Sequence, residues 1–441
     1  MIHIWLDYAE HLHKLREMIL SFTVENYRSI RERQSLIFEA SADSHLEDSH
    51  VIKQDGHKVL KSAAVYGANA SGKSNVINAM IWMRRFVLES MSAKVENPSI
   101  QVEPFRLHTE SRNDPSVFEI EFLLADIRYR YGFAVNQSGI EEEWLYRKAR
   151  KGATAKVFTR EKQDIQVNKR QEKGLEPFIP RTRPNVLFLK VCAEFNFGFA
   201  EWVMEWFRHF RYVSGLDETN FIGFTAERLG EDVHRERILE FIRKADFNLC
   251  GIRSNIEPLT EKDLPENMPS ELKKKVLEGE PLKGDILTSH NIYDPEGEIA
   301  GQEEFDLEED ESQGTRKFVA LAGPILHTIE EGSILPVDEF EARLHPNLTK
   351  AILQWFNGPQ NKNGAQLIIA SHDTGLMDPD LLRRDQIWFC EKDRLGNTSL
   401  YCLDEFDKQD VRATTKFNRQ YLQGIFGAVP QVALDEYQTS A

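Results

Sequence analysis

The fold of this chain is decided by residues 67–74, GANASGKS. An apolar run at 63–66 precedes them, and apolar residues at helical spacing (Val76, Ile77 and Met80) follow. The sequence therefore predicts a strand, a glycine loop and a helix, with the spacing G-x-x-x-x-G-K-[ST]. Glycines let successive backbone N–H groups point at one phosphate group, and the start of the helix adds its positive end. This stretch predicts a nucleotide-binding loop.

The side chains of the loop suit a nucleotide and its metal ion. Lys73 can bridge the β- and γ-phosphates, and the Ser74 hydroxyl can take one position on Mg²⁺. The predicted nucleotide-binding residues are Gly67, Asn69, Ser71, Gly72, Lys73, Ser74 and Asn75, with ATP and Mg²⁺ as cofactors. A chance match to the spacing is the alternative, and the flanking strand and helix argue against it. The loop alone would also fit a kinase or a GTPase.

The length of the chain, 441 residues, allows two or three domain-sized units or one large domain with insertions. The four cysteines are far apart in the sequence, which indicates reduced thiols and no disulfide or zinc framework. These thiols are typical of a cytoplasmic protein. No run of 18 apolar residues occurs, so we expect no membrane span. Residues 1–17 are interpreted as an upstream extension with no catalytic part.

Charge is unevenly distributed along the chain. The net charge of −16 argues against a protein that coats DNA or an anionic membrane. Residues 144–173 nevertheless hold ten Lys or Arg against three acids, and residues 303–311 hold seven acids. Each segment has two interpretations, a solvated surface or a binding surface, and a solvated surface is the more common of the two.

In the first half of the chain, apolar residues repeat at helical spacing in some segments and at every second residue in others. Strands are expected at 19–24 and 36–38, and an amphipathic helix at 74–91. From 117 to 167 the period drops to two and turn residues interrupt it, which predicts an antiparallel meander of hairpins. Residues 186–212 carry apolar and aromatic residues at helical spacing, which is typical of core or partner contacts.

A polar stretch separates this half from the next. Residues 254–311 contain five prolines and end in the acidic run, so we interpret them as an insertion with a mobile or partner-facing loop. Before and after it the expected elements are helices at 226–245, 315–329 and 345–356, a short helix near 381, and strands at 334–337, 366–370 and 386–389. Strands that alternate with helices on both sides of an insertion predict one α/β unit split in sequence.

An acidic pair, Asp338-Glu339, ends the predicted strand at 334–337. Ligands of such sheets bind at the carboxyl ends of the parallel strands. There Asp338 can accept a hydrogen bond from a Mg²⁺-bound water, and Glu339 can polarise the attacking water as a general base. The predicted metal-site residues are therefore Ser74 and Asp338, and Glu339 is a predicted catalytic residue. A strand that simply runs into an acidic turn is the alternative.

Two further polar groups have weaker signals. His372 follows the predicted strand at 366–370, where it could hydrogen-bond the γ-phosphate or hold the attacking water, and it is the second predicted catalytic residue. A satisfied structural histidine is the alternative. Ser312 and Gly314 open the helix at 315 and could form an anion site, although physics alone favours a simple capped helix.

As a set, these motifs resemble ABC-type ATPases of the SMC, RecF and overcoming-lysogenization (OLD) lineage. They are more closely similar to the stand-alone ATPases of bacterial abortive-infection and restriction-linked operons, the RloA/AbiL-like and PARIS AriA-like proteins. The matching stretches, which lie roughly within 19–125 and 312–430, are ILSFTVENYRSI, GANASGKSN, ESQGTRKF, ILPVDEFEARLHP, IIASHD, LRRDQIWFCEKD and YLQGIFGAVP. The resemblance implies an α/β ABC/SMC-type ATPase head, with a mixed sheet, an antiparallel β-subdomain and a helical insertion.

The resemblance also implies domains and an assembly. After the extension, the expected parts are 18–185 (first half of the head, with the meander), 186–311 (helical and polar insertion) and 312–441 (second half). In this lineage two heads dimerise with ATP between the loop of one and the signature of the other. Ser312 and Gly314 would therefore bind nucleotide held by a neighbouring copy, in dimeric units or larger assemblies. Relatives usually have Asp two residues after the acidic pair, whereas this chain has Glu341.

Three functions follow as hypotheses. The first, favoured because Glu339 suits hydrolysis, is an ATP-hydrolysing switch of a bacterial anti-phage defence system. It would control a separately encoded toxic effector, such as a TOPRIM-type nuclease, because too few residues follow His372 for the nuclease domain of OLD proteins. The second is a RecF/SMC-like DNA-binding maintenance or repair ATPase, supported by the basic residues at 144–173. The third is a scaffold in which ATP is structural.

Overall fold

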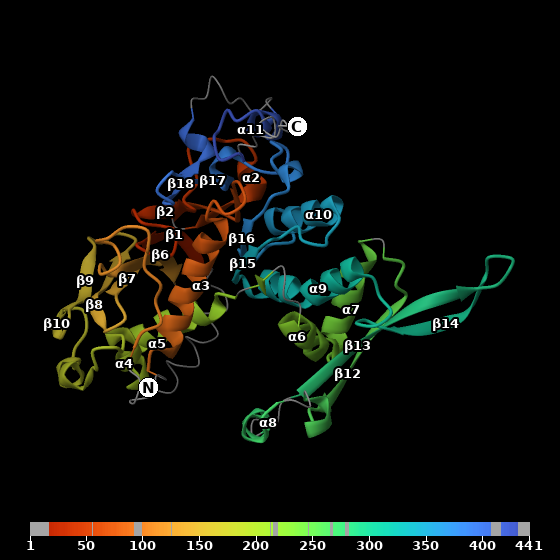
Figure 1. Ribbon diagram of the computed structural model, residues 1–441, viewed down its shortest axis with the longest axis horizontal. Helices are drawn as coiled ribbons and strands as arrows, with labels where there is room; N and C mark the ends of the chain where they lie inside the picture. The colour runs from red at the N-terminus through yellow and green to blue at the C-terminus, as the bar shows by residue number, and fades with distance from the viewer. Residues whose placement is uncertain are drawn as a thin grey trace, which may run out of the picture. The chain divides into compact units, whose positions relative to one another are not determined.

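The computed structural model describes residues 17–54, 56–91, 99–124, 126–211, 213–214, 219–245, 247–264, 268–277, 282–406 and 416–430 (Figure 1). These residues form two compact units. Unit 1 holds the residues up to 211 together with 329–340 and 350–430, and unit 2 holds 213–328 and 341–349. The predicted extension, except Glu17, lies outside the described residues. The domain boundaries predicted at 185 and 311 stay a prediction.

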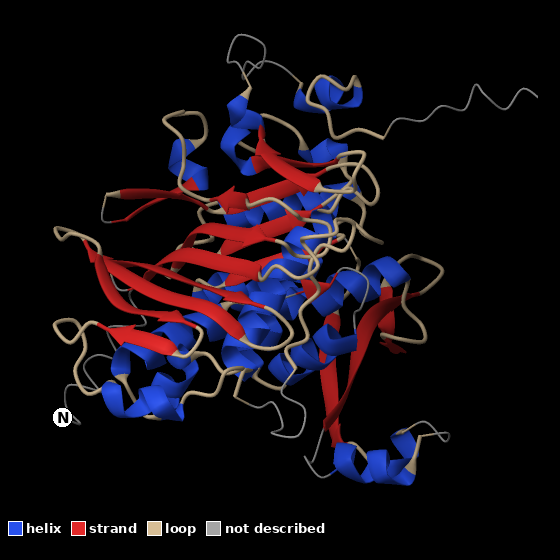
Figure 2. Ribbon diagram, turned by 60° about the vertical axis from the view of Figure 1, so that its left-hand side comes forward, coloured by secondary structure: helices blue, strands red, loops and turns tan. Residues whose placement is uncertain are grey.

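A seven-stranded antiparallel sheet forms one side of unit 1. Its order is β10-β9-β8-β7-β6-β1-β2, which confirms the predicted meander (Figure 2). The strands are β1 (Met18–Glu25), β2 (Gln34–Ile37), β6 (Ser116–Leu124), β7 (Ile127–Val135), β8 (Ile140–Ala149), β9 (Ala155–Glu161) and β10 (Asp164–Val167). Apolar residues alternate along them because one face is buried, as Phe118, Ile120 and Phe122 of β6 are at most 2% exposed.

A second sheet of unit 1 carries the glycine loop. In the order β15-β16-β5-β17-β18 the first four strands are parallel and β18 is antiparallel. The strands are β5 (Ser62–Tyr66), β15 (Ile334–Asp338), β16 (Gln366–Ala370), β17 (Ile387–Lys392) and β18 (Thr398–Cys402). Because β5 from the start of the chain lies between β16 and β17 from its end, the mixed sheet confirms the predicted split α/β fold.

Aromatic side chains of two helices pack on the antiparallel sheet. Trp82 of α3 (Lys73–Glu89) stacks on Phe118, with ring centroids 4.6 Å apart. Trp206 of α5 (Gly198–His209) stacks on Phe122 at 4.1 Å and is fully buried. The aromatic spacing at 186–212 thus reflects core packing, and helix α4 (Phe188–Glu194) belongs to the same layer.

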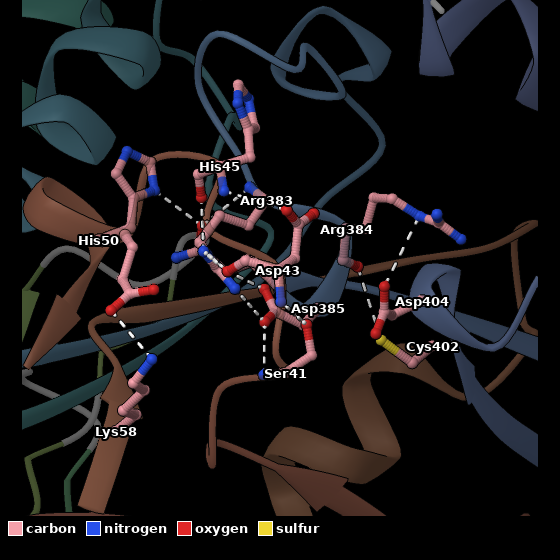
Figure 3. A network of polar contacts seen from close by, with 12 residues as sticks. Ser41, Asp43, His45, His50, Lys58, Arg383, Arg384, Asp385, Cys402 and Asp404 are labelled. Carbon is pink, nitrogen blue, oxygen red and sulfur yellow. Dashed lines mark hydrogen bonds and ion pairs between the residues drawn. The ribbon is translucent and has the colours of Figure 1, made fainter. Parts of the chain in front are cut away.

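A network of hydrogen bonds and an ion pair, here called the Arg383 staple, joins residues 41–45 to residues 383–385 in unit 1 (Figure 3). Arg383, which is 1% exposed, donates to the backbone oxygens of Asp43 and His45 and pairs with Asp385. Asp385 in turn accepts from the backbone N–H of Ser41. These bonds join positions about 340 residues apart in sequence, so both chain ends are needed to complete the unit.

Unit 2 contains a three-stranded antiparallel sheet, β12-β13-β14. Its elements are α6 (Thr219–Leu229), α7 (Asp232–Arg243), β12 (Gly251–Pro258), α8 (Ser270–Leu277), β13 (Leu282–Tyr293), β14 (Ile299–Asp306) and most of α9 (Gln313–Glu331). Beyond Ser289, β13 pairs only with β14, so residues 290–303 form a two-stranded ribbon. Three strands thus lie within residues 254–311, or begin just before them, where the sequence had predicted only an insertion with a loop, and its partner-facing role stays a prediction.

The remaining elements are short or connect the sheets. They are α2 (Glu47–His50), β3 (Val51–Gln54), β4 (His57–Leu60), the 3₁₀ turns Glu176–Arg181, Glu261–Asp263, Thr374–Leu376, Arg384–Gln386 and Leu403–Glu405, β11 (Val213–Ser214), α10 (Pro346–Asn357) and α11 (Phe417–Leu422). The short helix expected near 381 is a turn, in which the N–H groups of Leu381 and Leu382 both donate to Asp378 O and the pattern is not continued.

Candidate nucleotide-binding site

The loop between β5 and α3 has a backbone that only glycine can adopt at two positions. Gly67 and Gly72 have φ of 153° and 111°. A Cβ at Gly67 would overlap the carbonyl oxygen of Cys390, and one at Gly72 would overlap the side chain of Thr398. Cys390 itself is a neutral thiol, because burial raises its pKa to about 12. The loop is therefore held tightly from behind, while Asn69 at its tip is exposed.

Lys73 lies folded onto its own loop. Its ammonium donates to the carbonyl oxygens of Gly67 (2.9 Å) and Ala68 (3.1 Å), and the residue is 7% exposed. A buried ammonium needs such acceptors. Phosphate oxygens are stronger acceptors than neutral carbonyls, so a bound nucleotide could draw the ammonium away from them.

The predicted metal-site pair is in contact in the structure. Ser74 Oγ donates to Asp338 Oδ1 at 3.1 Å, which joins the first turn of α3 to the carboxyl end of β15. No group of three or more His, Cys, Asp or Glu side chains that could hold a metal lies within the part of the chain that is described. One hydroxyl and one carboxylate cannot complete the shell of Mg²⁺, so its other ligands would be water and phosphate oxygens.

Glu339 follows in an unusual backbone conformation. Its φ is 49°, in the left-handed region, and its N–H donates to Asp338 Oδ1 at 3.1 Å. The turn places Glu339 beside the Ser74–Asp338 contact and leaves its side chain partly exposed. Strained backbone of this kind persists where the surroundings impose it, often at functional sites.

His372 lies at the carboxyl end of β16, the strand between β15 and β5. The residue is exposed, and its neighbours Ser371 and Asp373 hold the turn, since Asp373 N–H donates to Ser371 Oγ at 3.0 Å. The ends of β5, β15 and β16 thus bring together the loop, the acidic pair and this histidine at one edge of the sheet, as ligand sites of parallel sheets require.

The loop fits a phosphate group on two observations of the structure. The two glycines form a cradle that any Cβ would fill. Among the described residues, the buried hydroxyl of Ser71 has no hydrogen-bond partner. An unpaired buried hydroxyl is costly, and an anion seated in the cradle could accept from it.

Ser312 and Gly314 lie in unit 2, at the start of α9. Ser312 Oγ accepts from the N–H of Thr315 at 3.2 Å and so caps the helix, and both Ser312 and Gly314 are at least partly exposed. The segment after the acidic pair packs on this turn, because Lys317 Nζ donates to Ala342 O. A Cβ at Gly314 would lie 3.3 Å from Arg343 O.

Sequence reasoning missed two hydroxyl residues behind the loop, Ser29 and Thr398. Thr398 Oγ1 donates to the carbonyl of Ser71 at 2.8 Å and contacts Ser29 Oγ at 2.8 Å. Asn75, predicted to bind nucleotide, donates through Nδ2 to Ser29 Oγ at 2.7 Å. No sequence signal identifies Thr398, since strand β18 was not predicted and threonine is common in strands.

A strand, a glycine loop and a helix, with a hydroxyl–carboxylate pair at the sheet edge, define a P-loop nucleotide-binding protein. The family model described as "AAA domain, putative AbiEii toxin, Type IV TA system" matches residues 62–378, which is more than half of the chain. The chain belongs to this family and is an AAA-type ATPase. No curated protein matches it.

Solved structures to which this chain is similar include SMC head domains and the recombination mediator protein RecF. The SMC head domain from Thermotoga maritima is 14% identical to this chain, with a TM-score of 0.38. The match covers 88% of this chain and 99% of that domain. RecF of the RecFOR pathway is 15% identical, with 87% and 98% covered and a TM-score of 0.35. The Smc head of Pyrococcus furiosus is 13% identical, with 93% and 100% covered and a TM-score of 0.35. Over the described residues, no helix is long and apolar enough to cross a membrane.

Proposed function

We propose that this chain is the ATP-hydrolysing switch of a bacterial anti-phage defence system and acts in the cytoplasm. The observation that carries the proposal is the 3.1 Å contact between Ser74 and Asp338, with Glu339 next to it. A hydroxyl and a carboxylate suited to Mg²⁺, followed by a candidate base, fit hydrolysis better than binding alone. The family description names a toxin–antitoxin system, which supports a role in defence.

Each residue of the site has a proposed task. Gly67, Asn69, Ser71 and Gly72 surround the phosphates, and Lys73 neutralises their charge. Asn75, whose side chain donates to Ser29, supports the loop from behind. Bound Mg²⁺ would supply charge stabilisation for transfer of the γ-phosphoryl group to water. Ser74 and Asp338 hold the ion, Glu339 accepts a proton from the attacking water, and His372 orients that water or the γ-phosphate.

We further propose that two copies share each nucleotide, in dimeric units or larger assemblies. Ser312 caps α9 by accepting from the Thr315 N–H, so the N–H groups proposed to meet an anion at this exposed helix start are those of Gln313 and Gly314. In this arrangement Ser312 and Gly314 contact the nucleotide bound to a neighbouring copy. ATP would then control how the copies assemble.

The ribbon of unit 2 is the proposed contact for the effector, a separate toxic chain such as a TOPRIM-type nuclease. Ile292, Tyr293 and Ile299 at its end are 43%, 54% and 62% exposed. Residues 290–311 contain ten acids and no Lys or Arg. A two-stranded ribbon is marginally stable alone, so exposed apolar residues on it favour a partner with a basic, partly apolar surface.

Glu339→Gln tests the proposed function. The variant should lose phosphate release at least a hundredfold and accumulate an ATP-dependent assembly on sizing, because the nucleotide binds and is not hydrolysed. Glu309→Gln, an exposed acid of unit 2, is the matched control and should behave as wild type. Unchanged phosphate release together with no ATP-dependent assembly would refute the switch. Slow wild-type hydrolysis with normal assembly in Lys73→Ala would instead indicate structural ATP.

DNA binding is the second candidate function, favoured by a hollow of about 580 Å³ on the antiparallel sheet. The cations that line it are Arg128, Arg130, Arg147, Lys148 and Lys156. Several are already paired, as Arg128 bonds Glu39 and Arg147 bonds Glu172. Arg160, counted with the basic residues at 144–173, is buried. The basic surface is therefore smaller than the sequence suggested.

Charge reversal separates the two functions. Reversal of Lys148, Arg150 and Lys151 should abolish salt-dependent binding of duplex DNA if the chain is a DNA-maintenance ATPase. Reversal of three exposed lysines elsewhere, Lys262, Lys274 and Lys392, is the control for net charge. Equal effects of the two triple variants, or no DNA binding by the wild type, would exclude this function.

A further inference from the structure

A chain of three side chains lies behind the nucleotide-binding loop and ends on its backbone. Asn75 Nδ2, Ser29 Oγ, Thr398 Oγ1 and Ser71 O follow one another at 2.7, 2.8 and 2.8 Å. The side chains of this hydrogen-bond chain come from the turn after β1, the first turn of α3 and the start of β18. The hydrogen bonds therefore link the loop to segments from both ends of the sequence.

Only one assignment of donors and acceptors fits this hydrogen-bond chain. The carbonyl oxygen of Ser71 can only accept, so the single hydrogen of Thr398 Oγ1 goes to it. The contact between the two hydroxyls then uses the hydrogen of Ser29. Ser29 Oγ is left to accept from the Asn75 amide, which is the bond observed. Every donor in the chain is thus committed toward Ser71.

Fixing the Ser71 carbonyl fixes the next N–H group. None of the described peptide bonds is cis, so the Ser71 C=O and the Gly72 N–H point in opposite directions. Because the carbonyl points at Thr398 on β18, the Gly72 N–H points away from that strand. Loops of this spacing bind phosphate through such backbone N–H groups.

Hydrogen bonds and van der Waals contacts fix the position of Thr398 relative to the loop. Thr398 is fully buried, and its N–H donates to Ser29 O at 2.8 Å. The neighbouring Asn397 accepts from Arg31 N–H at 2.8 Å. A Cβ on Gly72 would overlap Thr398, so the loop backbone and this side chain are in direct van der Waals contact. Loss of the hydroxyl would leave the buried Ser71 carbonyl unpaired.

We propose that Thr398 and Ser29 are positioning residues that aim the Gly72 N–H at the nucleotide phosphates. They touch neither the nucleotide nor the reacting atoms and act through the Ser71–Gly72 peptide. The inference rests on the proposed nucleotide site and adds the device that preorganises it. Preorganised donors matter because a loop that must reorient on binding loses affinity.

The test replaces each hydroxyl and measures ATP binding by titration with a fluorescent ATP analogue. Thr398→Val, which keeps the shape, should weaken binding about tenfold, the size expected for one lost orienting hydrogen bond. Its KM for ATP should rise with kcat nearly unchanged, because the N–H contacts phosphate before and during the reaction. Thr398→Ser should restore wild-type affinity, and Ser29→Ala should weaken binding about threefold.

Thr23→Val is the matched control, since Thr23 is also buried and its hydroxyl contacts Ser35 Oγ at 2.8 Å, away from the loop. It should leave ATP affinity unchanged even where stability falls. Wild-type affinity in Thr398→Val, or equal losses in Thr398→Val and Thr398→Ser, would overturn the inference. If Thr398→Val does not fold, wild-type affinity in Ser29→Ala overturns it. Absence of ATP binding in the wild type would overturn the proposed function itself.

Discussion

Glu143 shows at the residue scale how a buried charge is held in this protein. Its carboxylate accepts from the N–H groups of Phe188 and Leu189 at the start of α4 and lies 3.5 Å from Arg160. Both side chains of the pair are fully buried. Burial raises the pKa of Glu143, while the Arg160 charge and the backbone donors oppose that rise. The pair therefore fixes α4 on the antiparallel sheet.

Glu143→Ala should lower the free energy of unfolding by about 3–5 kcal/mol, because it leaves Arg160 buried without its partner. The measurement is urea unfolding, with the exposed neighbour Glu142→Ala as control at about 0.5 kcal/mol or less. The apolar double variant Glu143→Leu/Arg160→Met should not recover stability, since Arg160 also donates to the backbone oxygens of Val186 and Arg183. Full recovery would contradict this account.

His50 predicts a second residue-scale effect, a dependence of stability on pH. Its Nδ1 bonds Gln386 Oε1 at 2.8 Å, and that oxygen also accepts from Arg383 N–H, so the His50 nitrogen carries the hydrogen. Burial lowers the pKa of His50 from 6.5 to about 4. The unfolded chain thus binds a proton at a higher pH than the folded chain does.

Stability from His50 should be fully present above pH 6.5 and lost as the pH falls from 6.5 to 4. The loss should reach about 3 kcal/mol, from the size of the pKa difference. Thermal unfolding between pH 7 and pH 4 tests this, with His50→Asn as the variant that keeps an N–H donor but does not titrate. Parallel pH profiles for the two proteins would show that His50 does not contribute.

At the scale of elements, the sequence predicted the helices and strands whose apolar residues repeat at one regular spacing. Strands β6–β10 alternate because one face is buried, and β5 and α3 are identified by the glycine loop between them. Strand β14 was missed because its residues in the ribbon are mostly exposed on both faces and show no alternation. In β13 only a short part alternates, with Ile286 and Thr288 buried. The Thr398 chain and the Arg383 staple depend on contacts between distant segments, for which one sequence carries no signal.

Helix α5 gives an element-scale prediction. Trp206 is fully buried, stacks on Phe122 and lies edge-on to Phe207 at 5.2 Å. Trp206→Ala should destabilise unit 1 by about 3–5 kcal/mol, because a large cavity opens between α5 and the sheet. Phe195→Ala, 44% exposed before α5, is the control and should cost less than about 1 kcal/mol. The two variants are compared by the midpoint of denaturant unfolding, provided that the m-value is unchanged. Similar decreases in the free energy of unfolding in both variants would refute the packing account.

At the scale of the whole molecule, the acidic pair is joined to unit 2 by the chain itself. Asp338 ends β15 in unit 1 and Glu339 follows it, whereas Glu341 already belongs to unit 2. There the segment is fixed to the start of α9, because Lys317, 1% exposed, donates to Ala342 O. A change at Glu339 on nucleotide binding would reach α9 through two residues. Glu341 lies within this connection.

Lys317→Met should break the Lys317–Ala342 contact without changing the nucleotide-binding residues of unit 1. The variant should bind ATP within about twofold of wild type, since Lys317 lies outside unit 1. In the wild type, ATP should alter cleavage of the ribbon by a glutamate-specific protease at Glu296 and Glu298, both exposed, whereas in Lys317→Met cleavage should be the same with and without ATP. Arg316→Met is the matched control, because Arg316 is the neighbouring cation on α9 and donates to Glu308 O at 3.0 Å. Retained ATP dependence in Lys317→Met, or its loss in both variants, would mean that the signal does not pass through the Lys317–Ala342 contact.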